Sequence, residues 1–224
     1  MKTAILVDGA YYRKATNRIW TDESPREAVD RLYKYCMRHL GDKKDGETTY
    51  NDLYRIFYYD CPPIADNIYH PLLQKDVPLG KSSLYTWMND FIKEMKKQRK
   101  VALRLGTLSD YDLNYNLKFS TTKKLLRKDM TIDDLKEHDF QLNIRQKGVD
   151  MKIGIDIASL SYKKQVDQII LIAGDSDFVP AAKLARREGI DFVLDPLGRP
   201  IKEDLFEHID GLKSRDAQYY KHSK

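Results

Sequence analysis

The chain has 224 residues, of which 42% are hydrophobic and 33% are charged, and its formal net charge is +5. With only 11 Gly and 8 Pro it is neither a collagen nor a low-complexity chain, and it has no apolar run of about 18 residues that could cross a membrane. Two cysteines, Cys36 and Cys61, are too few for a disulfide framework or a four-cysteine zinc site, and the N-terminal apolar run is too short for a signal peptide. We therefore expect a globular, cytoplasmic protein with no membrane segment.

Five short runs of strand-forming residues are spaced along the chain, and each stops at a turn residue. They cover residues 3–7, 53–59, 101–105, 168–173 and 190–194. Their continuous apolar character is typical of parallel strands that are buried on both faces of a sheet. Segments with apolar residues at helical spacing lie between the strands, over residues 26–40, 82 to about 99, 149–164 and 178–188. Strands that alternate with helices predict an α/β fold with a mostly parallel central sheet.

No internal repeat and no Gly/Ser-rich linker divides the chain, so we expect a single domain over residues 1–224. Less regular stretches at about 20–50, 60–80 and 107–147 are expected to be insertions into this domain. The third of them is predicted to contain short helices, at 120–130 and 132–137, and the chain is expected to end in a short C-terminal extension.

Acidic residues follow two of the predicted strands directly. Asp8 comes after the first strand, and Asp175 and Asp177 come after the fourth. Because ligands of parallel α/β sheets bind at the carboxyl ends of the strands, these side chains converge if the two strands are neighbours. Asp150, near the start of the third helix, is a fourth candidate. Carboxylates without His or Cys suit Mg²⁺ or Mn²⁺, which can activate a water for phosphodiester hydrolysis.

Each of these acids also has a simpler interpretation, because an Asp between a strand and a helix is a common helix cap and Asp-Gly is a common turn. The joint placement of three acids at two strand ends favours a shared site over capping alone. Asp156 differs from the others, since six residues along a helix turn its side chain by about 240° away from Asp150. We predict that Asp156 is solvated or salt-bridged.

Several motifs, in their order along the chain, resemble those of the NYN domain. They are ILVDG at 5–9, KGVD at 147–150 together with Asp156, and GDSDFVP at 174–180, with RIFYYD at 55–60 and RLG at 104–106 resembling the second and third strands. The similarity is to the LabA-like (DUF88) branch of this family, within the PIN-like nuclease superfamily. It implies a Rossmann-like, three-layer α/β/α domain with a metal-dependent ribonuclease site.

The resemblance also implies roles for individual residues. Asp8, Asp150, Asp175 and Asp177 would form the catalytic and metal-binding set, holding Mg²⁺ or Mn²⁺. Ser176 would be a polar neighbour in the same loop that contacts the substrate.

One position departs from the family pattern, because many relatives carry Asn where this chain has Tyr11. A tyrosine cannot copy the amide, but its hydroxyl could bind a phosphate or its ring could stack on a base. The alternative is packing, and we expect at least one of Tyr11 and Tyr12 to lie in the core.

Basic residues form two runs, each of which is either a solvated helix face or a surface for single-stranded nucleic acid. The first contains Lys93, Lys96, Lys97, Arg99 and Lys100. The second follows Tyr111, Tyr115 and Phe119 and contains Lys118, Lys123, Lys124, Arg127 and Lys128, of which Lys123, Lys124 and Arg127 are the candidate substrate contacts. A metal-neutralised pocket of four aspartates would leave the rest of the chain four units more positive than +5, which suits a polyanionic partner.

The leading hypothesis is therefore a Mg²⁺- or Mn²⁺-dependent ribonuclease that cuts single-stranded or unpaired RNA internally. One alternative is a non-catalytic RNA-binding or regulatory adaptor on the same fold. A HAD-like phosphohydrolase is a weaker alternative, because that family needs Asp-x-Asp after its first strand and here Asp8 is followed by Gly9 and Ala10. A homo-oligomer remains open from the sequence.

Overall fold

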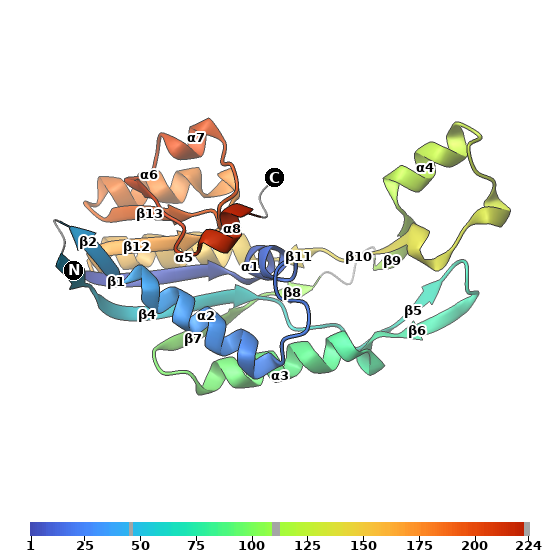
Figure 1. Cartoon of the computed structure of the whole chain (residues 1–224), viewed down its shortest axis with the longest axis horizontal. Coiled ribbons are helices and arrows are strands. Elements are labelled where there is room, and N and C mark those ends of the chain that lie inside the picture. The colour runs from blue at the N-terminus through green and yellow to red at the C-terminus, as the bar shows by residue number, and fades with distance from the viewer. Residues whose placement is uncertain (45–46, 109–112, 222–224) are drawn as a thin grey trace.

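A six-stranded, all-parallel sheet forms the centre of the molecule, in the order β14-β13-β12-β1-β4-β7 (Figure 1). The computed structural model describes residues 1–44, 47–108 and 113–221. The sheet strands are β1 (Lys2–Asp8), β4 (Asp52–Asp60), β7 (Val101–Leu105), β12 (Gln168–Ile172), β13 (Asp191–Asp195) and β14 (Gly211–Leu212). The predicted parallel sheet is confirmed, and its first five strands in chain order lie within two residues of the predicted ends.

The two central strands are buried on both faces, as their uninterrupted apolar sequences predict. Every residue of β12 is buried, and so are residues 3–7 of β1. Such strands need a helical layer on each side to cover them. The structure has two buried clusters, one on each face of the sheet, which establishes the three-layer α/β/α arrangement.

One face of the sheet is covered by α5 and α6, and the other by α1, α2 and α3 (Figure 1). These helices are α1 (Gly9–Thr16), α2 (Pro25–His39), α3 (Ser83–Lys97), α5 (Val149–Tyr162) and α6 (Val179–Arg187), and two short helices follow near the C-terminus, α7 (Glu203–Phe206) and α8 (Ala217–Lys221). Although α2 lies in the stretch at 20–50, its apolar stripe, including Val29 and Leu32, packs in the core.

Local signals in the sequence set where several helices begin. The Ser24 hydroxyl accepts the Glu27 amide, the Glu27 carboxylate accepts the Ser24 amide in return, and Pro25 occupies the first helical position of α2. These contacts satisfy amides that lack a partner within the helix. Gly148, with a φ of +78°, makes the turn into α5, a conformation that a side chain would strain.

A second, smaller part of the molecule projects beyond the carboxyl ends of the strands (Figure 1). We call it the arm, and it comprises residues 67–78 and 113–143. Its elements are β5 (Asn67–His70), β6 (Lys75–Pro78), β9 (Asn114–Leu117), α4 (Phe119–Leu126) and β10 (Phe140–Asn143), together with 3-10 turns at Ile132–Asp134 and Glu137–Asp139.

The arm is built from two of the predicted insertions, which pack on each other. The His70 ring lies 4.4 Å from the Tyr115 ring and 5.1 Å from the Phe140 ring, so the hairpin of the first segment shares a small aromatic core with the second. A short antiparallel pair, β8 (Thr107–Leu108) with β11 (Gln146–Lys147), joins the arm to the sheet. Tyr111 lies outside the described residues.

The remaining elements are peripheral. β2 (Gly41–Lys44) and β3 (Glu47–Tyr50) form an antiparallel pair after α2, and a 3-10 turn at Leu79–Lys81 precedes α3. Cys36 and Cys61 are both buried free thiols. Among the described residues, no helix combines the length and the apolar character needed to span a bilayer.

Candidate metal centre at the carboxyl edge of the sheet

The four predicted aspartates lie where the strand order of the sheet reverses. From β1 the chain proceeds through β4 to β7 on one side, whereas β12, β13 and β14 extend the sheet on the other side. β1 and β12 are hydrogen-bonded neighbours, with Val7 opposite Ile172. Their carboxyl ends form the crevice in which parallel α/β sheets bind ligands. Asp8 ends β1, and the loop with Asp175 and Asp177 follows β12.

The electrostatics show that these carboxylates share one region. Burial raises the pKa of Asp8, and the nearby Asp150 carboxylate raises it further. The pKa of Asp150 is also raised, first by desolvation and then by repulsion from Asp175 and Asp177. Asp150 therefore lies near both strand ends, because its carboxylate raises the pKa of Asp8 and its own pKa is raised by the two acids of the loop after β12.

Hydrogen bonds fix parts of this acidic set. Asp8 caps α1, since its Oδ1 accepts the Tyr11 amide at 3.0 Å. In the next loop, Asp175 Oδ1 accepts the Asp177 amide at 3.1 Å. The capping role that was the simpler interpretation is thus real for Asp8. A carboxylate has two oxygens, so capping and metal binding are compatible.

No three of the four aspartates bring ligand atoms within 4.8 Å of one another. Within residues 1–44, 47–108 and 113–221, the group that meets this distance is Asp204, Glu207 and His208, on and after α7. Two charges about 4 Å apart repel by roughly 4 kcal/mol at an effective dielectric of 20. Such repulsion keeps carboxylates apart until a cation compensates them.

Tyr11 packs beneath the acidic loop and bonds the neighbouring one. Its hydroxyl donates to the Pro196 carbonyl at 2.6 Å, and burial raises its pKa to about 12. A Cβ built on Gly174 would lie 2.5 Å from the Tyr11 ring, so only glycine fits at that position without displacing the ring. Tyr11 therefore ties the ends of β12 and β13 together, while Tyr12 is fully buried in the core as expected for one of the pair.

Ser176 is held by a cation that the sequence analysis did not single out. Lys202 Nζ donates to the Ser176 hydroxyl at 3.1 Å, and the Arg199 guanidinium lies 5.2 Å from the centre of the Tyr11 ring. Both cations lie in the loop after β13. One sequence feature could have pointed to these two cations: their loop follows the end of a predicted strand, directly after Asp195-Pro196. They place positive charge beside the acidic loop, where a phosphate would need it.

A fifth acid at this edge, Asp60, has a structural role. It ends β4, is fully buried and forms an ion pair with Arg13 from α1. It also accepts the Tyr58 hydroxyl at 2.9 Å and the Cys61 amide at 2.8 Å. Asp60 was visible in the RIFYYD motif, but its partner Arg13 lies far away in the sequence. Its charge is compensated within the protein.

The prediction for Asp156 is confirmed. Its Oδ2 accepts Arg104 Nε at 2.9 Å and the Tyr59 hydroxyl at 2.8 Å. This pair joins α5 to β7 and β4. The motif residue Asp156 thus acts in packing, apart from the four aspartates.

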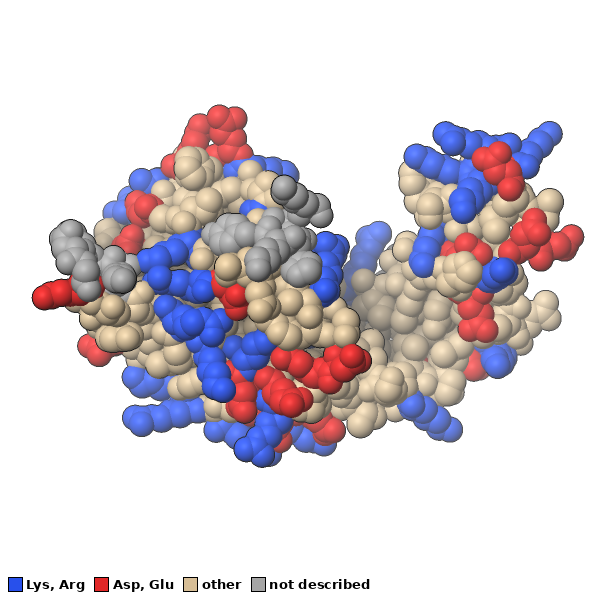
Figure 2. Space-filling view, in the orientation of Figure 1, with Lys and Arg blue, Asp and Glu red and all other residues tan. Residues whose placement is uncertain are grey.

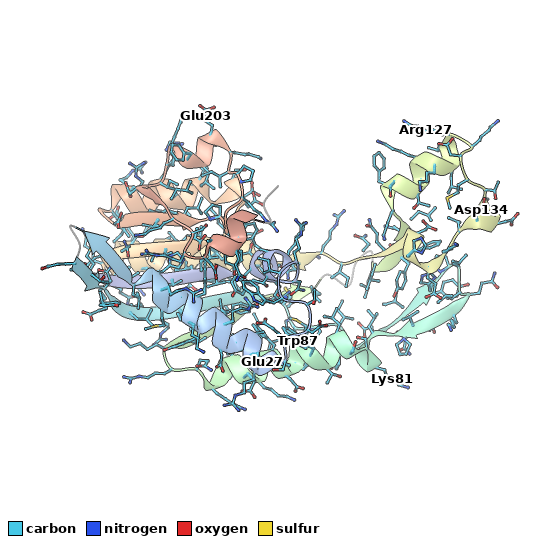
Figure 3. The ribbon with its side chains drawn as sticks, in the orientation of Figure 1. Glu27, Lys81, Trp87, Arg127, Asp134 and Glu203 are labelled. Atoms are coloured by element: carbon cyan, nitrogen blue, oxygen red, sulfur yellow. The ribbon has the colours of Figure 1, made fainter. Side chains whose placement is uncertain are left out.

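The candidate substrate contacts Lys123, Lys124 and Arg127 lie on the arm. They belong to α4 and the residue after it, and all three are exposed. Figure 3 labels Arg127 at the outer end of the arm, and Figure 2 shows lysine and arginine side chains gathered there. The fold does not bring these cations next to the aspartates. An opening separates the arm from the body in this view (Figure 2).

Comparison with known proteins identifies one domain family in the chain. The family model of the NYN domain matches residues 65–198, more than half of the chain, including Asp150, Asp175 and Asp177 but not Asp8. A crystal structure of a protein of unknown function from Vibrio parahaemolyticus is 14% identical, with a TM-score of 0.45 over 96% of this chain and 93% of that one. No curated protein sequence matches the chain. On the strength of the domain match and of the parallel sheet with its three-layer core, the chain belongs to the NYN domain family.

Proposed function

We propose that this protein is a metal-dependent ribonuclease of the LabA-like branch of the NYN family, with Asp8, Asp150, Asp175 and Asp177 as its catalytic set. The observation that carries the proposal is the convergence of these four carboxylates on the β1/β12 switch point. There burial raises the pKa of Asp8 and of Asp150, and the neighbouring carboxylates add to it: Asp150 acts on Asp8, and Asp175 and Asp177 act on Asp150. NYN domains belong to the PIN-like nucleases, whose chemistry requires such an acidic pocket.

The donor set fits a hard divalent cation. It offers carboxylate oxygens from two strand ends and one helix start, which is the chemistry that Mg²⁺ and Mn²⁺ prefer. A bound ion would lower the pKa of a coordinated water and stabilise negative charge on a phosphodiester. The chain itself orients the ligands, since the Tyr11 amide holds Asp8 and the Asp177 amide holds Asp175.

The surroundings of the acidic pocket support a phosphodiester as the substrate. Arg199 and Lys202 lie beside the β12 loop, and lysine and arginine side chains gather on the arm, across an opening from the body (Figure 2). A polyanion entering that opening would meet positive charge on the arm before its backbone reaches the aspartates. We propose single-stranded RNA as the substrate, because a strand without a partner can follow this bent path.

The proposal is tested by incubating the purified protein with labelled single-stranded RNA. We expect cleavage with Mg²⁺ or Mn²⁺, loss of cleavage with EDTA, and recovery when excess Mn²⁺ is added back. An Asp8→Asn variant is expected to be inactive under all of these conditions. RNA binding without cleavage by the wild type would instead identify a non-catalytic adaptor, and equal cleavage by wild type and variant would exclude the proposed site.

The arm is expected to contribute to affinity and not to chemistry. Replacing Lys123, Lys124 and Arg127 together by Glu should weaken RNA binding and flatten its salt dependence, since each lost phosphate contact on a single strand removes about 0.7 from the slope of log K against log salt. Fluorescence anisotropy over a salt series in EDTA measures both quantities. Asp129, Asp133 and Asp134 replaced by Asn serve as the arm control; a triple variant with unchanged slope would contradict this role.

A further inference from the structure

Two adjoining cavities lie along α1 and α3. Together we call them the α1–α3 groove. They have volumes of about 390 Å³ and about 340 Å³. They share four lining residues, Arg13, Asn17, Leu84 and Met88, so they lie side by side.

The larger cavity lies near the carboxyl ends of β1 and β4, although none of the four aspartates lines it. Ala10, two residues after Asp8 and in the first turn of α1, lines it, as do Pro62 and Pro63 directly after β4. The opposite wall comes from the end of the arm and its connection to the sheet, through Leu142, Ile144 and Gln146. Gln146 also reaches back to the site edge, with its Nε2 3.3 Å from Asp60 Oδ1. The last residues of the arm and the segment that joins it to the sheet therefore complete this cavity.

The smaller cavity continues the groove away from the aspartates and contains both tryptophans of the chain, Trp20 and Trp87. Trp87 belongs to α3, and its side chain reaches the segment before α2 (Figure 3). Its Nε1 donates to the Glu23 carbonyl at 2.9 Å, and its ring stacks on Phe91. The Arg31 guanidinium lies 4.4 Å from the centre of the Trp20 ring. The indoles are thus held in fixed orientations at the wall of the groove.

The groove combines exposed apolar surface with hydrogen-bond donors. Leu84, which lines both cavities, is 67% exposed, and Ile144 is 40% exposed. Exposed apolar side chains around a concavity mark a binding surface. Lys14 and Asn17 are exposed at the same wall of α1 and can donate to a phosphate or to a base edge. Flat apolar walls with a few donors are what an unpaired nucleobase requires.

We propose that the α1–α3 groove binds unpaired bases of the RNA strand whose phosphodiester lies at the aspartates. This inference rests on the proposed function and adds the position of the substrate. The larger cavity holds a base next to the cleaved bond, and the smaller cavity holds a base further along the same strand. A paired base cannot enter either cavity, because it is stacked inside a duplex. The groove therefore selects for single strands.

The test uses the two tryptophans as reporters, because both line the groove and no other tryptophan contributes. Titrating the full chain with a short oligouridine in EDTA should change the intrinsic fluorescence without any cleavage. A Leu84→Glu variant is expected to lose this change and to bind the oligouridine about tenfold or more weakly by anisotropy. Leu84 is exposed, so the variant should fold, which circular dichroism and a melting curve verify.

The matched control is Leu212→Glu, the same substitution at a 46% exposed leucine on β14 at the far edge of the sheet. It should bind like the wild type, and a duplex of the same length should bind both variants and the wild type equally. Unchanged oligouridine binding by Leu84→Glu would overturn the proposal, as would a change in oligomeric state confined to that variant, which would identify a self-association surface. Because no divalent ion is present, these results are independent of cleavage: absence of cleavage with Mn²⁺ would end the proposed function and leave the groove assignment intact.

Discussion

Replacing Asp150 or Asp175 by Asn is expected to lower the rate of RNA cleavage by about 100-fold or more. A metal ion supplies several kcal/mol of transition-state stabilisation, and about 1.4 kcal/mol corresponds to a factor of ten in rate. Losing one carboxylate weakens the binding of the ion and thereby the stabilisation of the transition state that the ion provides. Single-turnover cleavage of labelled RNA over a range of Mn²⁺ concentrations measures this effect, and excess Mn²⁺ should restore only part of the rate.

Asp156→Asn is the matched control, because it makes the same substitution on the same helix outside the acidic pocket. An Asn oxygen can still accept from the Tyr59 hydroxyl, and the partly exposed pair with Arg104 contributes less than about 1 kcal/mol. Its cleavage rate should stay close to that of the wild type. Loss of activity in Asp156→Asn equal to that in Asp150→Asn would show that the acidic pocket has been assigned to the wrong residues.

Measuring the stability of Asp150→Asn without metal shows whether a loss of activity comes from the chemistry or from unfolding. The pKa of Asp150 is raised above its ordinary value of 3.8, so the folded protein holds that proton more strongly than the unfolded chain does. Stability from this group is therefore lost as the pH rises from about 3.8 through the raised pKa. In EDTA, Asp150→Asn should melt no lower than the wild type, with a difference that grows over this pH range.

Replacing Asp195 by Ala is expected to destabilise the fold by about 3 kcal/mol or more, because each buried polar group that loses its partner costs about 1–3 kcal/mol. Asp195 ends β13 and is completely buried. One carboxylate oxygen lies 2.8 Å from His39 Nε2 and accepts the Tyr35 hydroxyl, and the other accepts the Ser214 hydroxyl and the Leu197 amide. Removing the carboxylate takes away the acceptor of the Tyr35 and Ser214 hydroxyls and of the Leu197 amide, and the polar contact of His39.

Urea denaturation of the wild type and Asp195→Ala measures the difference in free energy of unfolding. Asp195→Asn keeps an acceptor oxygen and should fall between the two. Asp133→Ala, an exposed aspartate on the arm, should change stability by less than about 0.5 kcal/mol. A loss below about 1 kcal/mol for Asp195→Ala would mean that water or neighbouring groups replace the carboxylate.

The parts of the site that the sequence revealed are those in which a short segment contains its own signal. An apolar run ending in an acid identified Asp8, Asp175 and Asp177, because a strand and the residue that follows it are contiguous in the chain. Asp60 and Asp195 end strands in the same way, yet their roles were not visible. Their partners, Arg13 and His39, come from helices far away in the sequence, and no local pattern shows which acids have such a partner.

The arm likewise has features that the sequence reveals and features that only the fold decides. The basic run at 118–128 and its helical character could be read from the sequence, and α4 lies close to the predicted position. Its separation from the aspartates could not be read, because it depends on the packing of His70 against Tyr115 and Phe140. The groove beside α1 has no sequence signature, since its walls come from α1, α3, the end of β4 and the base of the arm.

The sequence by itself determined the elements, the parallel sheet and the acids that end its strands, because periodicity and turn residues act over short stretches of chain. The tertiary structure decided which acids remain uncompensated, where the cations lie and which surfaces enclose a cavity. These depend on the strand order and on contacts between distant segments. In the folded protein, β1 and β12 bring Asp8 and Asp175 to one edge although more than half of the chain separates them.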